Sequence, residues 1–179
     1  AIGSDALDAV TTANSNVAIG MAALGANTGA SNTAVGDNAL LANTTGTTNT
    51  AVGALAGDAI TTGSSNVAVG YRSLSSNTTA ASNTAIGVDA LTSNTTGTSN
   101  TAVGRDTLNQ QTTASYNTAM GHQALNLNTS GANNTASGYK ALYANTTGVY
   151  NVAIGSTAGD AITTGGYNTS VGGNSLTTL

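Results

Sequence analysis

The stretch Asn83-Thr84-Ala85-Ile86-Gly87-Val88-Asp89-Ala90-Leu91-Thr92-Ser93-Asn94-Thr95-Thr96-Gly97-Thr98-Ser99 recurs, with small changes, along the whole chain. The glycine that ends each Asn-x-Ala-x-Gly segment sets the period, and it occurs at Gly3, Gly20, Gly36, Gly53, Gly70, Gly87, Gly104, Gly121, Gly138, Gly155 and Gly172. Nine of the ten intervals are 17 residues, and one is 16, where Asn27-Thr28-Gly29 has lost a residue. A fixed period of this length is typical of stacked repeat proteins, and the tolerated deletion indicates a loop.

The composition favours a thin, extended core over a spherical one. The 179 residues include no Phe, Trp, Pro, Cys or Glu, and six Tyr are the only aromatic residues. Little bulky material is therefore present to fill a compact interior at normal packing density. Disorder is disfavoured because only 6% of the residues are charged and the apolar residues return on schedule.

The charge and hydropathy of the chain exclude several classes of partner. The formal net charge is −4 with three basic residues, which disfavours nucleic acid binding. No apolar run is long enough to span a bilayer, and no signal peptide is visible. The chain begins within a repeat, at Ala1-Ile2-Gly3. We therefore expect residues 1–179 to be a single repeat domain and a fragment, or a processed piece, of a longer protein.

One β-strand per repeat is predicted directly after the asparagine. When each copy is numbered from this Asn as position 1, positions 2 and 4 are mostly Thr, Val or Ile, while position 3 is almost always Ala and position 5 is always Gly. Bulky and small residues thus alternate with a period of two, as they do in a strand. We expect the bulky side chains to face the interior of the coil.

A turn and a return to the core are predicted for the rest of the repeat. Positions 6 and 7 vary and carry most of the charge, whereas position 9 is usually Leu. Position 12 is usually Asn, but it is Ile60 and Ile162 in the two copies whose position 9 is Gly57 or Gly159. Volume conservation predicts that positions 9 and 12 share one interior space. Position 13 is Thr in ten copies, from Thr11 to Thr163, and we expect a second strand over positions 10–14.

These features predict an all-β protein with the architecture of a parallel β-solenoid. We expect about eleven coils of 17 residues, each with two short strands and stacked about 4.8 Å from the next. Equivalent residues would then stand above one another. The asparagines of position 1 would form a structural ladder of hydrogen-bonded amides, in which the members that follow Asn16 are Asn32, Asn49, Asn66, Asn83, Asn100, Asn117, Asn134, Asn151 and Asn168.

The segment Asn66-Val67-Ala68-Val69-Gly70 and its copies resemble the Asn-Ser-Val-Ala-Ile-Gly signature of the YadA-like trimeric autotransporter adhesin head. The longer unit Asn-Thr-Ala-Val-Gly-x-x-Ala-Leu-x-x-Asn-Thr-Thr-Gly resembles repeats of bacteriophage tail fibres. The likeness covers essentially the whole chain, although autotransporter heads use shorter coils. It implies a left-handed roll packed as a homotrimer, an extracellular, cell-surface or virion location, and a role in attachment, with no catalytic residues.

The residues themselves also favour association, because a coil this narrow buries little apolar surface on its own. We expect the Ala and Gly columns to let neighbouring subunits approach closely, and a homotrimer is the predicted assembly.

No chemistry is predicted. His122 is the only histidine and has no Cys, Glu or second His for a metal set, so we expect no metal, no cofactor and no enzymatic activity. Tyr116, Tyr150 and Tyr167 share position 17 and are candidates for contact with a cell-surface glycan or receptor, or with a neighbouring subunit.

The predicted function is that of a structural and adhesive fibre segment, either shaft or head. A self-assembling extracellular filament is the first alternative, because the open ends of a solenoid invite stacking. An ice-binding solenoid is the second. It is disfavoured because such a face needs two outward Thr columns, and position 13 is flanked at positions 11 and 15 mainly by Ala, Ser and Gly.

Overall fold

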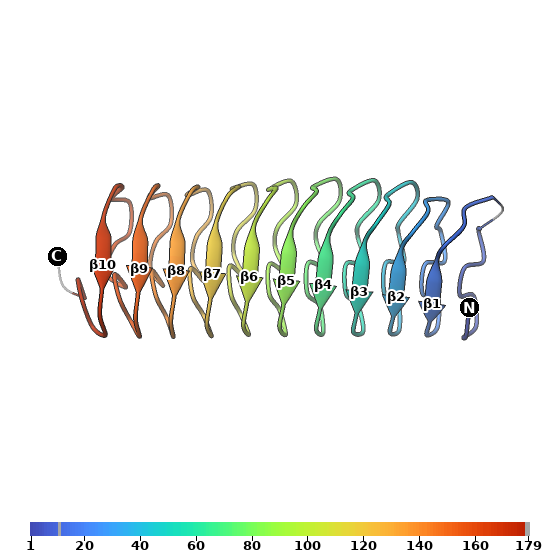
Figure 1. The fold of residues 1–179 in the computed structure, drawn as a ribbon, viewed down its shortest axis with the longest axis horizontal. Coiled ribbons are helices and arrows are strands. Elements are labelled where there is room, and N and C mark those ends of the chain that lie inside the picture. The colour runs from blue at the N-terminus through green and yellow to red at the C-terminus, as the bar shows by residue number, and fades with distance from the viewer. Residues whose placement is uncertain (11, 178–179) are drawn as a thin grey trace.

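The computed structural model describes residues 1–10 and 12–177, which form a rod of stacked coils (Figure 1). Its one sheet contains ten parallel strands in chain order. The strands are β1 (Val17–Ile19), β2 (Thr33–Val35), β3 (Thr50–Val52), β4 (Val67–Val69), β5 (Thr84–Ile86), β6 (Thr101–Val103), β7 (Thr118–Met120), β8 (Thr135–Ser137), β9 (Val152–Ile154) and β10 (Thr169–Val171). The predicted all-β solenoid with a 17-residue period is confirmed.

The register of the sheet places equivalent residues of successive repeats side by side. Ala85 of β5 is paired with Ala102 of β6, 17 residues later. Between β1 and β2 the offset is 16, because Val17 is paired with Thr33, so the missing residue is absorbed outside the strands. The ten strands enclose about nine full turns, and a bridge between Ile2 and Ile19 extends the stack at its N-terminal end.

The predicted second strand is wrong, because the described residues contain no strand over positions 10–14. The threonine of position 13 links the coils there instead. The backbone N–H of Thr44 and its Oγ1 both donate to the carbonyl of Thr61, at 2.8 and 3.0 Å. Equivalent hydroxyl bonds recur from Thr28 to Thr146, whereas Thr11 lies outside the described residues. A hydroxyl donor to the next coil explains why threonine occupies this position.

The predicted orientation of the strands is also wrong. The alternation of bulky and small residues is present, but the small side chains face inward. Ala85 is fully buried, whereas its neighbour Ile86 is 39% exposed. The same pattern holds in every strand, where the central residue is buried and its two neighbours are not. The Ala column therefore fills the core, and the β-branched columns lie on the outer face of the sheet.

The narrow width of the coil accounts for this reversal. The leucines of position 9 reach the interior from the opposite side, as predicted, and Leu91 is completely buried. A Cβ placed on Gly159, which occupies position 9, would lie only 3.5 Å from the Cβ of Ala153 in β9. Positions 3 and 9 are thus in direct contact across the coil. A Val or Ile side chain at position 3 would occupy the space that the leucine fills.

The glycines of position 5 allow the coils to stack closely where each strand ends. A Cβ placed on Gly87 would lie 2.5 Å from the carbonyl oxygen of Gly104 in the next coil, and Gly87 has a φ of +137°. Both the contact and the backbone conformation exclude larger residues. This close approach is the reason why the glycine column is unbroken.

The coils follow a longer period of three, or 51 residues, which is most evident at positions 12 and 16. Position 12 is apolar or Gln in every third coil, at Val10, Ile60, Gln111 and Ile162, and Asn in the coils between. Position 16 cycles through three residue types, namely Ala30, Ala81 and Ala132, then Thr47, Thr98 and Val149, then Ser64, Ser115 and Gly166. The backbone N–H groups of Thr47 and Thr98 donate to the Oγ atoms of Ser64 and Ser115, at 3.0 and 2.9 Å. Neighbouring coils are therefore matched to each other in groups of three.

Candidate functional site

The asparagines of position 1 form an internal file that joins the coils through side-chain to backbone hydrogen bonds. The Oδ1 of Asn83 accepts from the backbone N–H of Asn100 at 3.0 Å, and its Nδ2 donates to the carbonyl of Gly97 at 2.8 Å. The same pair of bonds recurs from Asn32 to Asn151. Direct amide-to-amide bonds are fewer and include Asn100 Nδ2 to Asn83 Oδ1, at 3.1 Å. These groups bind the coils together and are buried away from any ligand.

Sequence reasoning missed a second internal file of amides at position 12. Asn145 Nδ2 donates to Asn128 Oδ1 at 3.1 Å, and Asn128 Nδ2 donates to Gln111 Oε1 at the same distance. Asn43 and Asn145 each precede an isoleucine in the next coil, and the Oδ1 of each has no hydrogen-bond partner among the described residues. The file therefore ends at each isoleucine, and it is also interrupted at Asn94, whose Oδ1 has no partner among the described residues.

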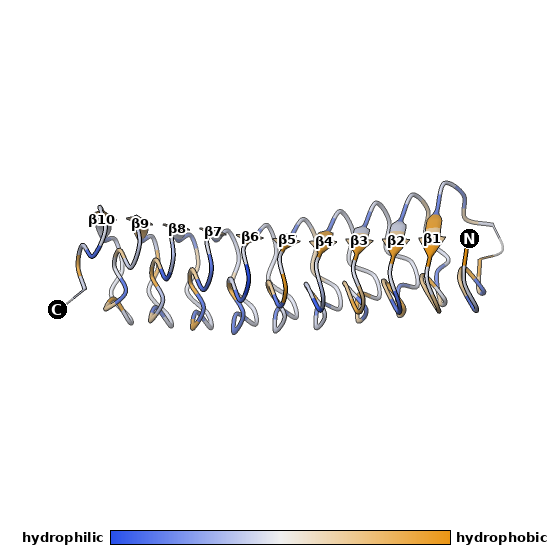
Figure 2. Ribbon diagram, turned by 90° about the horizontal axis from the view of Figure 1, so that it is seen from below, coloured by the Kyte–Doolittle hydropathy of each residue, from blue (hydrophilic) through white to orange (hydrophobic). Residues whose placement is uncertain are grey.

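The outer face of the sheet, at positions 2 and 4, is an uncharged surface that runs along the rod. The exposed members of the position 4 file are Ile2, Ile19, Val52, Ile86, Met120, Ile154 and Val171. All ten charged residues occupy positions 6, 7 or 10. Figure 2 shows the apolar colour on the strands, most clearly toward β1. We call this surface the sheet face. The absence of charge from positions 2 and 4 is the sequence signal that could have identified it.

The predicted tyrosines of position 17 lie on the surface. Tyr150 and Tyr167, on successive coils, stack with ring centroids 5.0 Å apart and an interplanar angle of 14°. Tyr116 is exposed two coils before Tyr150, and Asn133 occupies the coil between them. The file therefore brings two of the three predicted tyrosines into contact and leaves Tyr116 apart.

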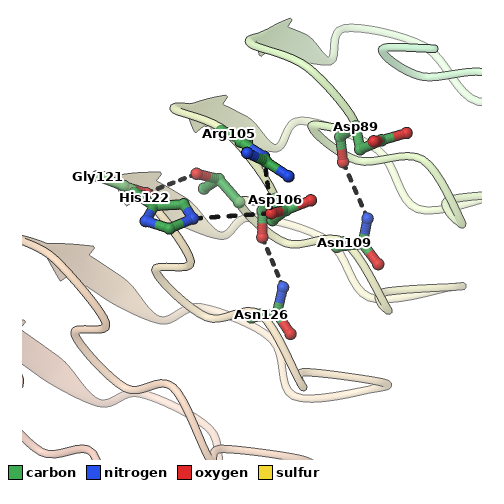
Figure 3. A network of polar contacts seen from close by, with 8 residues as sticks. Asp89, Arg105, Asp106, Asn109, Gly121, His122 and Asn126 are labelled. Atoms are coloured by element: carbon green, nitrogen blue, oxygen red, sulfur yellow. Dashed lines mark hydrogen bonds and ion pairs between the residues drawn. The ribbon is translucent and has the colours of Figure 1, made fainter.

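The charged residues gather on the turn that follows each strand, where they form a surface network (Figure 3). Arg72 Nε lies 3.6 Å from Asp89 Oδ1, and Arg105 Nε lies 3.3 Å from Asp106 Oδ2. His122 Nε2 lies 3.7 Å from the same Asp106 oxygen. Exposed pairs of this kind contribute about 0–1 kcal/mol each. The network thus orders the surface side chains more than it stabilises the fold.

Where position 10 is asparagine or Thr92, its side chain donates to a carbonyl of the preceding coil. Asn109 Nδ2 donates to the carbonyl of Asp89 at 3.1 Å, and Asn126 Nδ2 donates to that of Asp106 at 2.7 Å (Figure 3). Asp58 and Asp160 occupy the same position, and the Oδ1 of each is buried without a hydrogen-bond partner among the described residues. Burial raises the pKa of the Asp58 carboxyl above its ordinary value. Hydrogen bonds from the backbone N–H groups of Asp58 and Ala59, together with the charge of Arg72, oppose part of this rise.

Neither a cluster of metal-ligating side chains nor a pocket is found among the described residues. Within residues 1–10 and 12–177, no group of three or more His, Asp, Cys or Glu residues could hold a metal ion. The same residues enclose no pocket. None of their segments is a helix long and apolar enough to cross a membrane. The surfaces of the rod are therefore its candidate functional sites.

Comparison of the chain with protein-family models, with curated proteins and with solved structures finds no match.

Proposed function

We propose that the chain is a structural and adhesive segment, either shaft or head, of a phage tail fibre or a bacterial surface adhesin. In this role three parallel copies pack into a homotrimer of left-handed rolls, outside the cell or on a virion. The extracellular location and the hand of the coil rest on the resemblance of the repeat to adhesin heads and tail fibres. The assembly rests mainly on one structural observation, the uncharged sheet face that runs along the whole rod.

The sheet face has the composition of a subunit interface. Its position 4 file is apolar in all but one coil, Ser137, and no charged side chain interrupts it. Depletion of charge is the compositional mark of buried interface cores. A file of apolar side chains along the surface is costly for a monomer, because it remains in contact with water. The proposed contact therefore uses the Val and Ile columns, and not the Ala and Gly columns that the sequence suggested.

A second copy of this chain is the partner whose spacing fits this surface. Side chains of the sheet face recur once per coil, about 4.8 Å apart, over ten strands. A parallel copy has the same rise per coil, so apolar side chains of the two rods meet at every level. A globular partner has no such repeat and would match only a few levels. Closed cyclic symmetry, which is usual for homo-oligomers, then limits the number of copies.

The mass of the protein in solution, measured by light scattering, tests this assembly. We expect three times the mass of the chain, and a monomeric mass contradicts the proposal. The variant Ile86→Asp places a charge on the sheet face and is expected to reduce the mass to that of a monomer. Val88→Asp is the matched control, because Val88 is equally exposed, at 41% against 39%, but lies in the turn outside the sheet face. This control should remain a trimer.

An ice-binding function is the second candidate, and the arrangement of the strands favours it more than the sequence did. Thr84 and Ile86 both point outward with Ala85 between them, so the sheet face carries a mostly Thr column beside a Val and Ile column. The ice face considered from the sequence used position 13, whose hydroxyls bond to the next coil. A monomeric mass together with thermal hysteresis at micromolar protein would favour ice binding. A trimer without hysteresis favours the fibre.

Electron microscopy distinguishes a self-assembling filament from the fibre segment and from the ice-binding protein. A free filament would show rods of unlimited length joined end to end. A fibre segment would show rods of one length in the native particle.

A further inference from the structure

The positive charge of the chain is concentrated on one stretch of one edge. Its three basic residues are Arg72, Arg105 and Lys140, and its single histidine is His122. All four occupy position 6 or 7, in the turn that directly follows the strand. Five of the seven aspartates lie outside the span from Arg72 to Lys140. This edge is therefore electropositive relative to the rest of an acidic rod.

Cations and aromatic rings lie together over three consecutive coils, with the rings on the second and third of them. We define the aromatic edge as Arg105, His122, Tyr139, Lys140 and Tyr143. Lys140 Nζ lies 5.5 Å from the ring centroid of Tyr139 and 5.0 Å from that of Tyr143. The His122 and Tyr139 rings lie 5.7 Å apart, tilted by 38°. The cation–π contacts hold the ammonium group between two rings.

Lys140 differs from the other cations in having no carboxylate neighbour. Arg72, Arg105 and His122 each lie within 4.0 Å of an aspartate, whereas no ion pair joins Lys140 to another described residue. Tyr139 is 47% exposed, and the side chain of Arg105 is 70% exposed. An accessible ring and an unpaired ammonium group thus lie side by side and are available to a ligand.

These groups suit a carbohydrate that carries carboxylates. The apolar C–H face of a pyranose packs on an exposed aromatic ring, and the tyrosine hydroxyl at the ring's end remains free for hydrogen bonds. An ammonium group donates charge-assisted hydrogen bonds to a carboxylate. The described residues form no pocket, so a compact small molecule would remain largely in water. A linear polymer lying along the rod meets position 6 groups about 4.8 Å apart on successive coils.

Other polymers fit this edge less well. A nucleic acid needs many phosphate contacts, and this chain has three basic residues with a net charge of −4. A protein partner needs a well-packed apolar anchor, and the aromatic edge has no cavity to receive one.

We propose that the aromatic edge binds an acidic polysaccharide through its carboxylates and sugar rings. The proposal rests on the adhesive function proposed above for its biological role. The binding contacts themselves do not depend on the trimer, because they lie on one chain and use no residue of the sheet face.

The test is a titration of the whole chain with polygalacturonate and, separately, with polysialic acid, followed by calorimetry. We expect at least one polymer to bind and the affinity to fall as salt is added. If polygalacturonate binds, its methyl ester, which keeps the sugar and loses the charge, should bind at least about tenfold more weakly. Failure of both acidic polymers, or equal binding of the bound polymer's methyl ester, overturns the proposal.

Three variants assign the binding to the aromatic edge. Lys140→Met keeps the aliphatic stem and removes the charge, and Tyr139→Leu keeps an apolar group and removes the ring. Each should weaken binding at least about tenfold. Tyr71→Leu is the matched control, because Tyr71 occupies the same position 6 as Tyr139 and is similarly exposed, at 48%, but lies four coils away and outside the aromatic edge. Wild-type affinity in Lys140→Met, or an equal loss in Tyr71→Leu, overturns the assignment.

The mass of each sample separates this proposal from the assembly. A monomer that binds the acidic polymer contradicts the trimer and retains the polysaccharide site. A trimer that binds neither polymer contradicts the polysaccharide site and retains the assembly.

Discussion

The coil that contains Leu91 and Asn94 and the coil that contains Gly57 and Ile60 fill the same interior in two ways. Leu91 and Ile60 are both fully buried. A Cβ placed on Gly57 would lie 2.9 Å from Ile60 Cδ1, so a larger residue at position 9 would meet the isoleucine. The prediction that positions 9 and 12 share one space is confirmed. These two coils therefore keep one large apolar side chain in the shared space and exchange its position, whereas the coil of Leu108 and Gln111 buries a large side chain at both positions.

The exchange changes the hydrogen bonds inside the coil. In the Leu91 type of coil, Asn94 Nδ2 donates to the carbonyl of Gly97 at 2.9 Å. In the other type, Ile60 has no amide and makes no such bond. An Oδ1 without a partner among the described residues occurs both before Ile60, at Asn43, and in the Leu91 coil itself, at Asn94. The isoleucine coil therefore gains apolar packing and loses the hydrogen bond from position 12 to its own turn.

Truncation of either large interior side chain should give the largest effect. Leu91→Ala and Ile60→Ala are each expected to destabilise the chain by about 2–5 kcal/mol, because each leaves a cavity in a core only one side chain wide. Val88→Ala, in the exposed turn, should change stability by less than about 0.5 kcal/mol. Urea unfolding followed by circular dichroism measures the three variants. A small effect of Ile60→Ala alone would show that the two coil types do not depend equally on this space.

Conversion of one coil type into the other should give an intermediate effect. Gly57→Leu overfills the interior and is expected to cost about 1–3 kcal/mol. The backbone itself accepts the change, because Gly57 and Leu91 have similar φ values of +58° and +52°. Adding Ile60→Asn removes the clash and supplies an amide next to Asn43.

The double variant Gly57→Leu with Ile60→Asn should therefore be more stable than either single variant. The coupling between the two sites, from a double-mutant cycle in urea, should lie in the range of about 0.5–3 kcal/mol. Additive effects of the two substitutions would contradict the shared space.

Replacement of the aspartate at position 10 of the isoleucine coil should give the smallest effect, and it should be stabilising. Asp58→Asn supplies a donor of the kind that Asn109 uses toward the preceding coil, and one hydrogen bond contributes about 0.5–1.5 kcal/mol. Asp8→Asn is the matched control at the same position, because Asp8 is exposed and should show no gain.

The gain from Asp58→Asn should depend on pH. Because burial raises the pKa of the Asp58 carboxyl, the folded protein binds this proton more tightly than the unfolded chain does. The wild-type protein therefore loses stability as the pH rises through the folded pKa and recovers it as the pH falls. The difference between variant and wild type should be largest at neutral pH and should shrink in acid. A difference that grows in acid would contradict the burial of the carboxyl.

The period, the stacking, the buried leucines and the exchange between positions 9 and 12 could be predicted from the sequence, because each follows from spacing or from volume. The inward side of the strands could not. Bulky residues usually face a core, but here Leu91 from the opposite turn already fills the space beside Ala85. The second strand was predicted because position 13 holds threonine in ten copies, whereas the hydroxyl of this threonine makes the contact that was attributed to a strand.

Little in the sequence indicates that non-glycine residues of the turn adopt a positive φ. Asp89 and Leu91 both have positive φ, at 56° and 52°, which is uncommon for residues other than glycine. The strain of about 1–2 kcal/mol for such a residue is offset by the burial of the leucine. The glycines Gly57 and Gly159 at position 9 are the sequence feature that could have indicated a positive φ at this position. For the candidate surfaces, the charge-free columns were visible in the sequence, but their meaning depended on knowing which side of the strand faces out.

The matching of coils in groups of three sets a rule for the length of the rod. Removing the 51 residues from Val67 to Asn117 would join Asn66 to Thr118 and keep the order of the coil types, so each serine of position 16 would still meet its threonine. Removing one repeat would bring unlike coils together. A protein built in this way grows or shortens in increments of about 14 Å, the rise of three coils, so the length of the rod changes in fixed steps.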